Sequence, residues 1–223
     1  DLGSPLQRVY EPGRVALDGP RNSGSAIDAT LWQNHTDGRI YLLWKNKLPS
    51  SVRQIALQEL MPLAAPVPAL RATSSPPQVL LLATLEWEAH DVEGPFVWEE
   101  PGSPYLYLFY SGSNTWGDTY AVGVARAQSI VGPWTKLGAP VAHTRAGATQ
   151  GVNTTFVSPG HNSVVRKDGR TFLVYHASRW NETGVNCVRY MMVDELVFGE
   201  DYWPQLVTPD GAPSDTPQPM PPA

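Results

Sequence analysis

The sequence predicts an all-β protein. Its 223 residues include 22 prolines and 19 glycines, which favour turns, and eight tryptophans and nine tyrosines, which favour strands. Asp37-Gly38, set between two apolar runs, is a strong signal for a tight hairpin turn. Aromatic side chains are typical of carbohydrate-binding surfaces and equally of ordinary β cores. Composition therefore predicts the fold class and leaves the function open.

The expected strands fall into three groups with the same strand-turn-strand layout, each about 50 residues long. Each group begins with a strand that carries a polar residue. Such a repeat of short strands is typical of the blades of a β-propeller. The expected strands span residues 26–32, 39–45, 54–60 and 79–85 in the first group, 105–112 and 120–126 in the second, and 162–166, 171–175 and 188–193 in the third.

The remaining parts of the chain are expected to be peripheral. Residues 1–20 predict an outer strand and a turn, and residues 61–77 predict a connector rich in proline and alanine. We therefore expect one β domain over residues 1–205. Residues 206–223 are proline-rich and polar, which predicts an extended tail.

Charge and hydropathy argue against two classes of partner. The net charge is −5 and there is no run of Lys or Arg, so nucleic acid is not an expected partner. No apolar run approaches the roughly 20 residues of a membrane span. The single cysteine, Cys187, cannot form an internal disulfide; a buried free thiol and a bridge to another chain both remain open.

Three Asn-X-Ser/Thr sequons, at Asn34, Asn153 and Asn181, fall in expected turns or loops and could carry glycans. They favour a secreted glycoprotein, although chance alone gives one or two sequons in a chain of this length. Residues 1–3 do not resemble a signal peptide, so a processed N-terminus is expected.

Glu93 is the first candidate for chemistry. It stands between the β-branched Val92 and the pair Gly94-Pro95, which predicts a position where a strand ends and the chain turns. Apolar residues nearby in sequence, including Trp98, would raise the pKa of its carboxyl, as a general acid near neutral pH requires. The alternative is a solvated glutamate before a turn.

A combination of motifs around Glu93 resembles glycoside hydrolase family 43, the arabinanase, arabinofuranosidase and β-xylosidase group. Val92–Pro95 is followed by the aromatic strand Tyr105–Gly112 and then by Tyr120–Arg126; Ile27–Leu31 and Ser158–Val165 add to the match. The resemblance implies a five-bladed β-propeller. This chain would supply about three and a half blades: the outer part of blade 2 and blades 3, 4 and 5.

The resemblance also implies roles for single residues. Glu93 matches the catalytic acid, and Asp28 matches a third carboxylate that orients the acid and tunes its pKa. Arg189 matches an arginine close to the sugar. His161 matches a histidine beneath the sugar that often approaches a cation, commonly calcium, with contact through water expected because calcium prefers oxygen ligands. The alternatives are local backbone bonding for Asp28, a core histidine and an exposed arginine.

Three aromatic residues, Trp87, Phe96 and Trp116, are candidates for the wall of a sugar pocket, although core packing explains each equally well. No metal-ligand spacing, phosphate loop or nucleophile triad occurs in the sequence, and no cofactor is expected for the chemistry.

The catalytic base is not matched. In the family it is an aspartate on the first blade, and Asp1 and Asp18 lack its sequence context. A companion chain or an N-terminal segment is therefore expected to complete the propeller and supply the base. Two functions follow: an inverting glycosidase acting on arabinose- or xylose-containing plant polysaccharide, or a lectin-like propeller that binds sugar without hydrolysis. The sequence does not decide between arabinose and xylose, or between endo and exo action.

Overall fold

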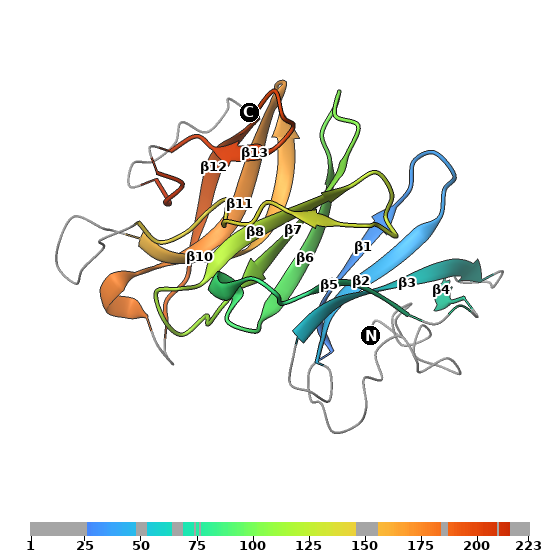
Figure 1. The fold of residues 1–223 in the computed structure, drawn as a ribbon, viewed down its shortest axis with the longest axis horizontal. Coiled ribbons are helices and arrows are strands. Elements are labelled where there is room, and N and C mark those ends of the chain that lie inside the picture. Colours follow the sequence, from blue (N-terminus) through green and yellow to red (C-terminus); the bar gives the residue numbers. More distant parts are fainter. Residues whose placement is uncertain are drawn as a thin grey trace.

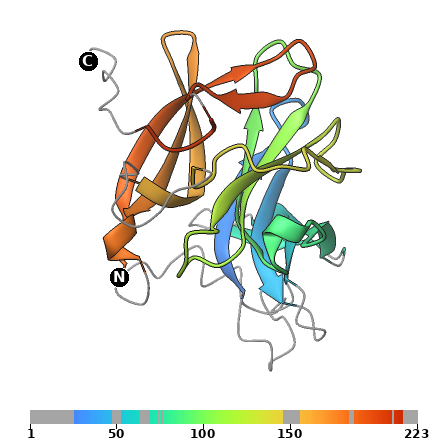
Figure 2. The same ribbon diagram turned by 60° about the vertical axis from the view of Figure 1, so that its left-hand side comes forward.

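Three antiparallel sheets hold all the strands in the part of the chain that the structure, a computed structural model, describes: residues 26–47, 53–63, 69–73, 75, 77–145, 156–183, 187–208 and 210–214. The sheets lie side by side in chain order (Figures 1 and 2). Within these ranges the helical segments are two 3-10 turns, η1 (Glu86–Glu88) and η2 (Trp180–Glu182), and neither could cross a membrane. The predicted all-β class is confirmed.

The first sheet is built on the predicted hairpin. Gly38, with φ +75°, closes the turn through its N–H bond to the Asn34 carbonyl at 2.8 Å. The fourth strand of this sheet, at Ala69–Ala72, lies in the segment 61–77 that the sequence predicts as a connector. It pairs with the end of the third strand, at residues 60–63. The strands are β1 (Ile27–Gln33), β2 (Ile40–Lys47), β3 (Arg53–Leu63) and β4 (Ala69–Ala72), with β5 (Gln78–Leu82) also paired to β3.

The second and third sheets are four-stranded meanders in which each strand pairs with the next along the chain. Such meanders are the units from which propellers are built. The number of blades and the closure of the ring remain predictions. The strands are β6 (Val92–Glu99), β7 (Leu106–Gly112), β8 (Ala121–Ala127) and β9 (Thr135–Lys136) in the second sheet, and β10 (Phe156–Lys167), β11 (Arg170–Arg179), β12 (Tyr190–Phe198) and β13 (Pro204–Leu206) in the third.

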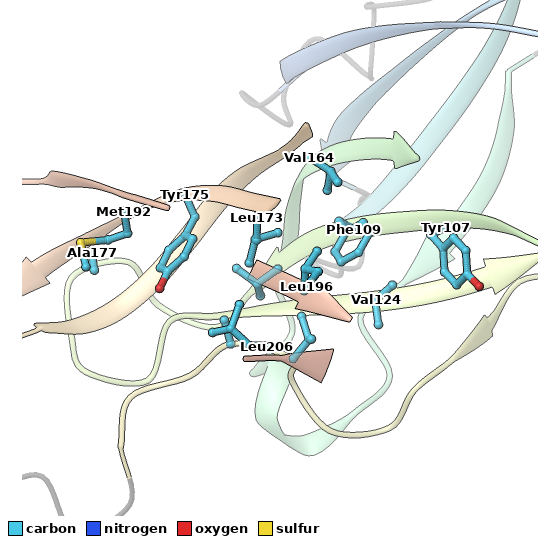
Figure 3. Close-up of a cluster of buried hydrophobic side chains, with 13 residues drawn as sticks. Tyr107, Phe109, Val124, Val164, Leu173, Tyr175, Ala177, Met192, Leu196 and Leu206 are labelled. Carbon is cyan, nitrogen blue, oxygen red and sulfur yellow. The ribbon is translucent and has the colours of Figure 1, made fainter. Parts of the chain in front are cut away.

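The second sheet is buried on both faces. Tyr107 and Phe109 of β7 pack into a cluster with Leu173 and other side chains of the third sheet (Figure 3). Leu108 and Tyr110, which point the other way along the same strand, pack into a cluster with the first sheet. A strand with two buried faces needs a continuous apolar sequence, which explains why β7 does not alternate polar and apolar residues.

The turn η1 is anchored by a buried carboxylate. Glu88 is fully buried and accepts hydrogen bonds from the N–H groups of Thr84 and Leu85 at 2.7 and 2.8 Å and from the Tyr110 hydroxyl at 2.7 Å. Lys136 of β9 donates to both of its oxygens, at 2.5 and 2.8 Å. Burial, together with the Glu88 charge, raises the pKa of Tyr110 far above its usual range. One carboxylate thus ties the segment before β6 to β7 and β9.

The described C-terminal residues pack against the sheets. Gly211 accepts a bond from the N–H of His143 at 3.0 Å, and Ala212 is buried. Residues 1–25 and 215–223, on which the outer-strand prediction and most of the tail prediction fall, lie outside the described residues.

Replacing Glu88 with alanine should lower the free energy of unfolding by about 3–5 kcal/mol, because it leaves a largely buried lysine without its counter-charge. Chemical denaturation of wild type and variant measures the difference. Glu86→Ala, an exposed position in the same turn, is the matched control and should change stability by less than about 0.5 kcal/mol. Equal stability of the two variants would contradict the anchoring role.

Candidate active site

Glu93 lies at the start of the second sheet's first strand. It is the second residue of β6 and pairs with Ser111 of β7. The prediction that Glu93 stands where a strand ends is therefore wrong. The Gly94-Pro95 pair forms a bulge inside the strand, between Glu93 and Phe96, made possible by the φ of +56° at Gly94. Strands tolerate proline at bulges, where a ladder hydrogen bond is already missing.

Both oxygens of the Glu93 carboxylate are held by side chains from elsewhere in the fold. Lys45 of β2 donates to Oε2, and the hydroxyl of Tyr120, just before β8, donates to Oε1. Lys45 is 5% exposed and also contacts Asp91 Oδ1 at 2.9 Å. Arg53 Nε lies 3.1 Å from Asp91 Oδ2. The result is a cluster of two carboxylates and two cations in which Lys45 is shared.

Lys45 is also the main reason that the pKa of Glu93 is lowered. Burial is the largest single influence and acts to raise the pKa of Glu93, but the hydrogen bond and charge of Lys45, with help from Tyr120 and His161, outweigh it. The pKa of Glu93 is therefore lowered, and the expectation that apolar neighbours raise it is wrong. The pKa of Asp91 is raised, chiefly by burial, in spite of its contact with Lys45.

Asp28 is brought directly to this position. Gly94 is the residue that follows Glu93, and its N–H donates a hydrogen bond to Asp28 Oδ2 at 3.2 Å. Asp28 has a φ of +58° and lies at an irregularity in the pairing of β1 with β2. The two partners are 66 residues apart in sequence, so this hydrogen bond is not a local one. Asp28 thereby supports the backbone that carries Glu93.

The third sheet reaches the site through His161. Its N–H donates to Ser111 Oγ at 2.7 Å, and a Cβ on Gly94 would lie 3.4 Å from its Cγ. The side chain is exposed rather than in the core. Within the described residues no three His, Cys, Asp or Glu side chains gather closely enough to hold a metal ion. A cation near His161 therefore stays a prediction.

Tyr120 is fixed by the third sheet as well. A Cβ at Gly160 would lie 1.8 Å from the Tyr120 ring, so only glycine fits beneath it. The ring also stacks on His176, with centroids 5.8 Å apart. Burial, followed by the charges of Arg189 and His161, lowers the pKa of His176 to about 4, so His176 is neutral at neutral pH. Contacts with the third sheet therefore fix the ring of Tyr120, whose hydroxyl bonds Glu93.

A cavity of about 320 Å³ opens beside Glu93. Lys45, Asp91 and the segment Ser113–Trp116 are among its lining residues. Trp116 is 50% exposed. Arg189 reaches the rim, where its Nη2 donates to Thr115 Oγ1 at 3.1 Å. The structure thus brings Glu93, Asp28, His161, Arg189 and Trp116 to one place.

Two predicted wall residues are not brought to this cavity. Phe96 packs against the core between the second and third sheets. Trp87 stacks on Tyr110, with centroids 6.0 Å apart, and its indole N–H donates to the Gly138 carbonyl at 3.0 Å. Trp87 instead lines a second cavity next to the first.

The candidate glycan sites remain predictions. Asn34 lies in the turn after β1, where its side chain accepts the N–H of Thr36 at 2.9 Å. Asn181 lies in η2, and Asn153 is outside the described residues. Cys187 is half-buried and forms no disulfide within the described part of the chain.

Sequence reasoning missed Lys45, Tyr120 and Asp91. Lys45 offered one signal, since it is a charged residue that ends the apolar run Tyr41–Trp44 on a strand expected to be buried. A charge in such a place is almost always paired. Asp91 offered another, two residues before Glu93 and so on the same side of an extended segment.

Replacing Lys45 with methionine should raise the pKa of Glu93 above its usual value of about 4.3, because burial is then opposed only by the weaker effects of Tyr120 and His161. The carbon chemical shift of the Glu93 carboxyl, followed against pH, measures it. Lys167→Met, an exposed position, is the matched control and should leave this pKa low. An unchanged pKa in Lys45→Met would contradict the assignment.

The stability profile should change accordingly. In wild type the lowered pKa of Glu93 gives stability that is present above the unfolded pKa and lost as the pH falls through the folded one. In Lys45→Met the folded pKa lies above the unfolded value, so this contribution is present at low pH and lost as the pH rises. The variant should therefore lose more stability at pH 7 than at pH 4, which unfolding at both pH values measures.

Two known enzymes match part of this sequence. The chain is 34% identical over 111 residues to a β-D-galactofuranosidase of Aspergillus niger, a match of 49% of this chain and 29% of that protein. It is 29% identical to an extracellular exo-α-(1→5)-L-arabinofuranosidase of Cellvibrio japonicus, covering 52% of this chain and 33% of that protein. The matched segments thus span about a third of these relatives.

Solved structures match over more of the chain. A thermostable family-43 glycoside hydrolase superposes with a TM-score of 0.70 at 28% identity, covering 89% of this chain and 62% of that one. An α-L-arabinofuranosidase from Lactobacillus brevis gives 0.64 at 25% identity, covering 81% and 55%. The model of the family described as glycosyl hydrolases family 43 matches residues 10–204. The chain belongs to glycosyl hydrolases family 43.

Proposed function

We propose that this chain carries the catalytic acid of an inverting glycosidase that cleaves arabinose- or xylose-containing plant polysaccharide or oligosaccharide. One observation carries the proposal: the carboxylate of Glu93 faces a cavity, both of its oxygens are bonded by side chains from elsewhere in the fold, and residues of all three sheets lie around it. Lys45 and Asp28 reach it or its backbone from the first sheet, Tyr120 from the second, and His161 from the third. The family's glycosidase chemistry supports the same role.

In this mechanism Glu93 protonates the leaving oxygen while a second carboxylate activates water on the opposite face of the sugar. An inverting pair stands about 6.5–9.5 Å apart to leave room for that water. Asp28 and Tyr120 act as positioning residues, since the first bonds the Gly94 N–H and the second bonds Oε1. Arg189 and Trp116 at the cavity would contact the sugar through hydroxyl hydrogen bonds and ring packing.

The acid role requires Glu93 to take up a proton that its ion pair with Lys45 disfavours. A second carboxylate placed across the cavity would raise the pKa of Glu93, because like charges resist ionising together. We therefore propose that the base, supplied from outside this chain, also prepares the acid. Binding of a neutral sugar would add to the effect by excluding water.

A companion chain or an N-terminal segment would supply that base and complete the propeller. Apolar side chains on the two outermost sheets support this proposal. Ile27 and Leu31 on β1 are 48% and 52% exposed, and Met191 on β12 is 77% exposed. Strand faces of this kind are normally covered in folded proteins.

Arabinose-containing substrates are supported by relatives named for α-(1→5)-arabinan, and xylose-containing ones by the family's range. Two curated relatives, the Cellvibrio japonicus arabinofuranosidase and an endo-arabinanase of Bacillus subtilis, are named as extracellular. Secretion is proposed for this protein on the same ground, together with the sequons.

The second candidate is a lectin-like propeller that binds sugar without cleaving it. The lowered pKa of Glu93 favours it, because a carboxyl held ionised by Lys45 donates no proton at neutral pH.

Glu93→Gln separates these functions. It should lower hydrolysis of arabino- or xylo-oligosaccharides by the completed protein by about 10²–10⁴-fold, the contribution of a general acid, while sugar affinity changes little. Turnover assays and calorimetry measure the two quantities. Glu99→Gln, on the same strand but exposed, should retain full activity. Undiminished turnover in Glu93→Gln would remove the acid role, and binding without turnover in wild type would favour the lectin.

Mass spectrometry under native and then denaturing conditions tests the companion chain. A native particle that releases a second polypeptide on denaturation is the expected result, and that polypeptide should carry an aspartate whose replacement by asparagine stops turnover. A native mass equal to this chain alone, from protein that nevertheless hydrolyses the oligosaccharides, would contradict a separate source for the base.

A further inference from the structure

A second cavity, of about 550 Å³, lies next to the Glu93 cavity. Sites for small ligands commonly have volumes of about 300–1,000 Å³. Its wall is mainly apolar and includes Trp87, Ala121, Ala139 and Pro140. We call it the Trp87 cavity.

The two cavities are adjacent. Ala89, after η1, and Ser113, after β7, line both of them. The remaining wall comes from η1, from the start of β8 and the segment before it, and from the segment after β9. These segments lie at the end of the second sheet where β6 and β8 begin and β7 ends, which is the end where Glu93 lies. Ala89 and Ser113 thus lie between the two cavities, and an oligosaccharide that occupied both would pass over these two residues.

The aromatic wall is rigid. The Trp87 ring packs so closely on the second sheet that a Cβ on Gly112 or Gly123 would lie 2.6 and 2.8 Å from its nearest atoms. Its N–H is satisfied by Gly138. A ring fixed in this way loses little conformational freedom when a ligand packs on it. Trp87 thus offers a preformed apolar surface for the face of a sugar ring.

The polar groups of the cavity suit a neutral polyol. Glu86 and Asp118 are exposed, and neither carboxylate forms an ion pair with a described residue. Free carboxylates accept hydrogen bonds from hydroxyl groups and repel anions. An apolar floor edged by such acceptors favours a neutral sugar and disfavours a uronic acid.

We propose that the Trp87 cavity is a second saccharide subsite, which binds a neutral pentose unit of the same chain whose neighbouring units lie at Glu93. The proposal rests on the proposed function, since it assumes that the Glu93 cavity binds sugar. The subsite would bind the substrate at a position away from the bond that is cleaved.

Blocking the cavity without touching Glu93 tests the proposal. Ala139→Trp fills it from an exposed position. Thr135→Trp places the same side chain on exposed β9, outside the cavity, as the matched control. Thr119→Trp blocks the opposite wall and serves if Ala139→Trp folds poorly. Calorimetry then measures binding of linear α-1,5-arabino-oligosaccharides and β-1,4-xylo-oligosaccharides of two to six units.

Wild type and Thr135→Trp should bind the longer oligosaccharides of one series about tenfold more tightly than its disaccharide, which corresponds to about 1.4 kcal/mol. Ala139→Trp should lose this gain and keep the disaccharide affinity. The same length dependence in Ala139→Trp and Thr135→Trp would overturn the subsite while leaving sugar binding at Glu93 intact. Failure of wild type to bind any oligosaccharide would overturn both the subsite and the proposed substrate class.

Discussion

Burial of the second sheet on both faces is the constraint on which the rest of the structure depends. Tyr107 and Phe109 of β7 are buried against the third sheet, and Leu108 and Tyr110 of the same strand are buried against the first. The burial of β7 therefore depends on both neighbouring sheets. Fully burying each such side chain contributes about 1.5–3 kcal/mol. Because the neighbouring sheets must pack this closely, side chains from both of them lie near the start of β6, where Glu93 stands.

This packing places Lys45 of the first sheet against two carboxylates, those of Glu93 and Asp91. A lysine only 5% exposed is stable when ionised because Glu93 and Asp91 surround its ammonium group. The same contact lowers the pKa of Glu93, which disfavours donation of a proton from its carboxyl group. In the proposed acid role, the protonation of Glu93 depends on added negative charge beside it or on the removal of water. Under that proposal the partner that completes the propeller would control the chemistry.

Much of the fold could be predicted from the sequence because its signals are local. Asp37-Gly38 predicted the first hairpin, and the aromatic run around Phe109 predicted a strand there, whose burial on both faces the structure adds. The site could be predicted only in part. Glu93 and Asp28 were found through their motifs, but the pKa of Glu93 depends on Lys45, 48 residues away, and not on the aromatic residues beside it in sequence. Adjacency along a strand says little about contact, because successive side chains point to opposite faces.

Trp87 shows the same principle with a functional consequence. Its position six residues before Glu93 suggested one pocket, but η1 and the bulge at Gly94 turn the two side chains into neighbouring cavities of opposite character. One is charged and the other is mainly apolar. In the proposed glycosidase the two surfaces would have different tasks: charged groups act at the bond that breaks, and apolar contact binds the non-reacting part of the substrate. The short distance along the chain between Trp87 and Glu93 fixes how the two surfaces are spaced.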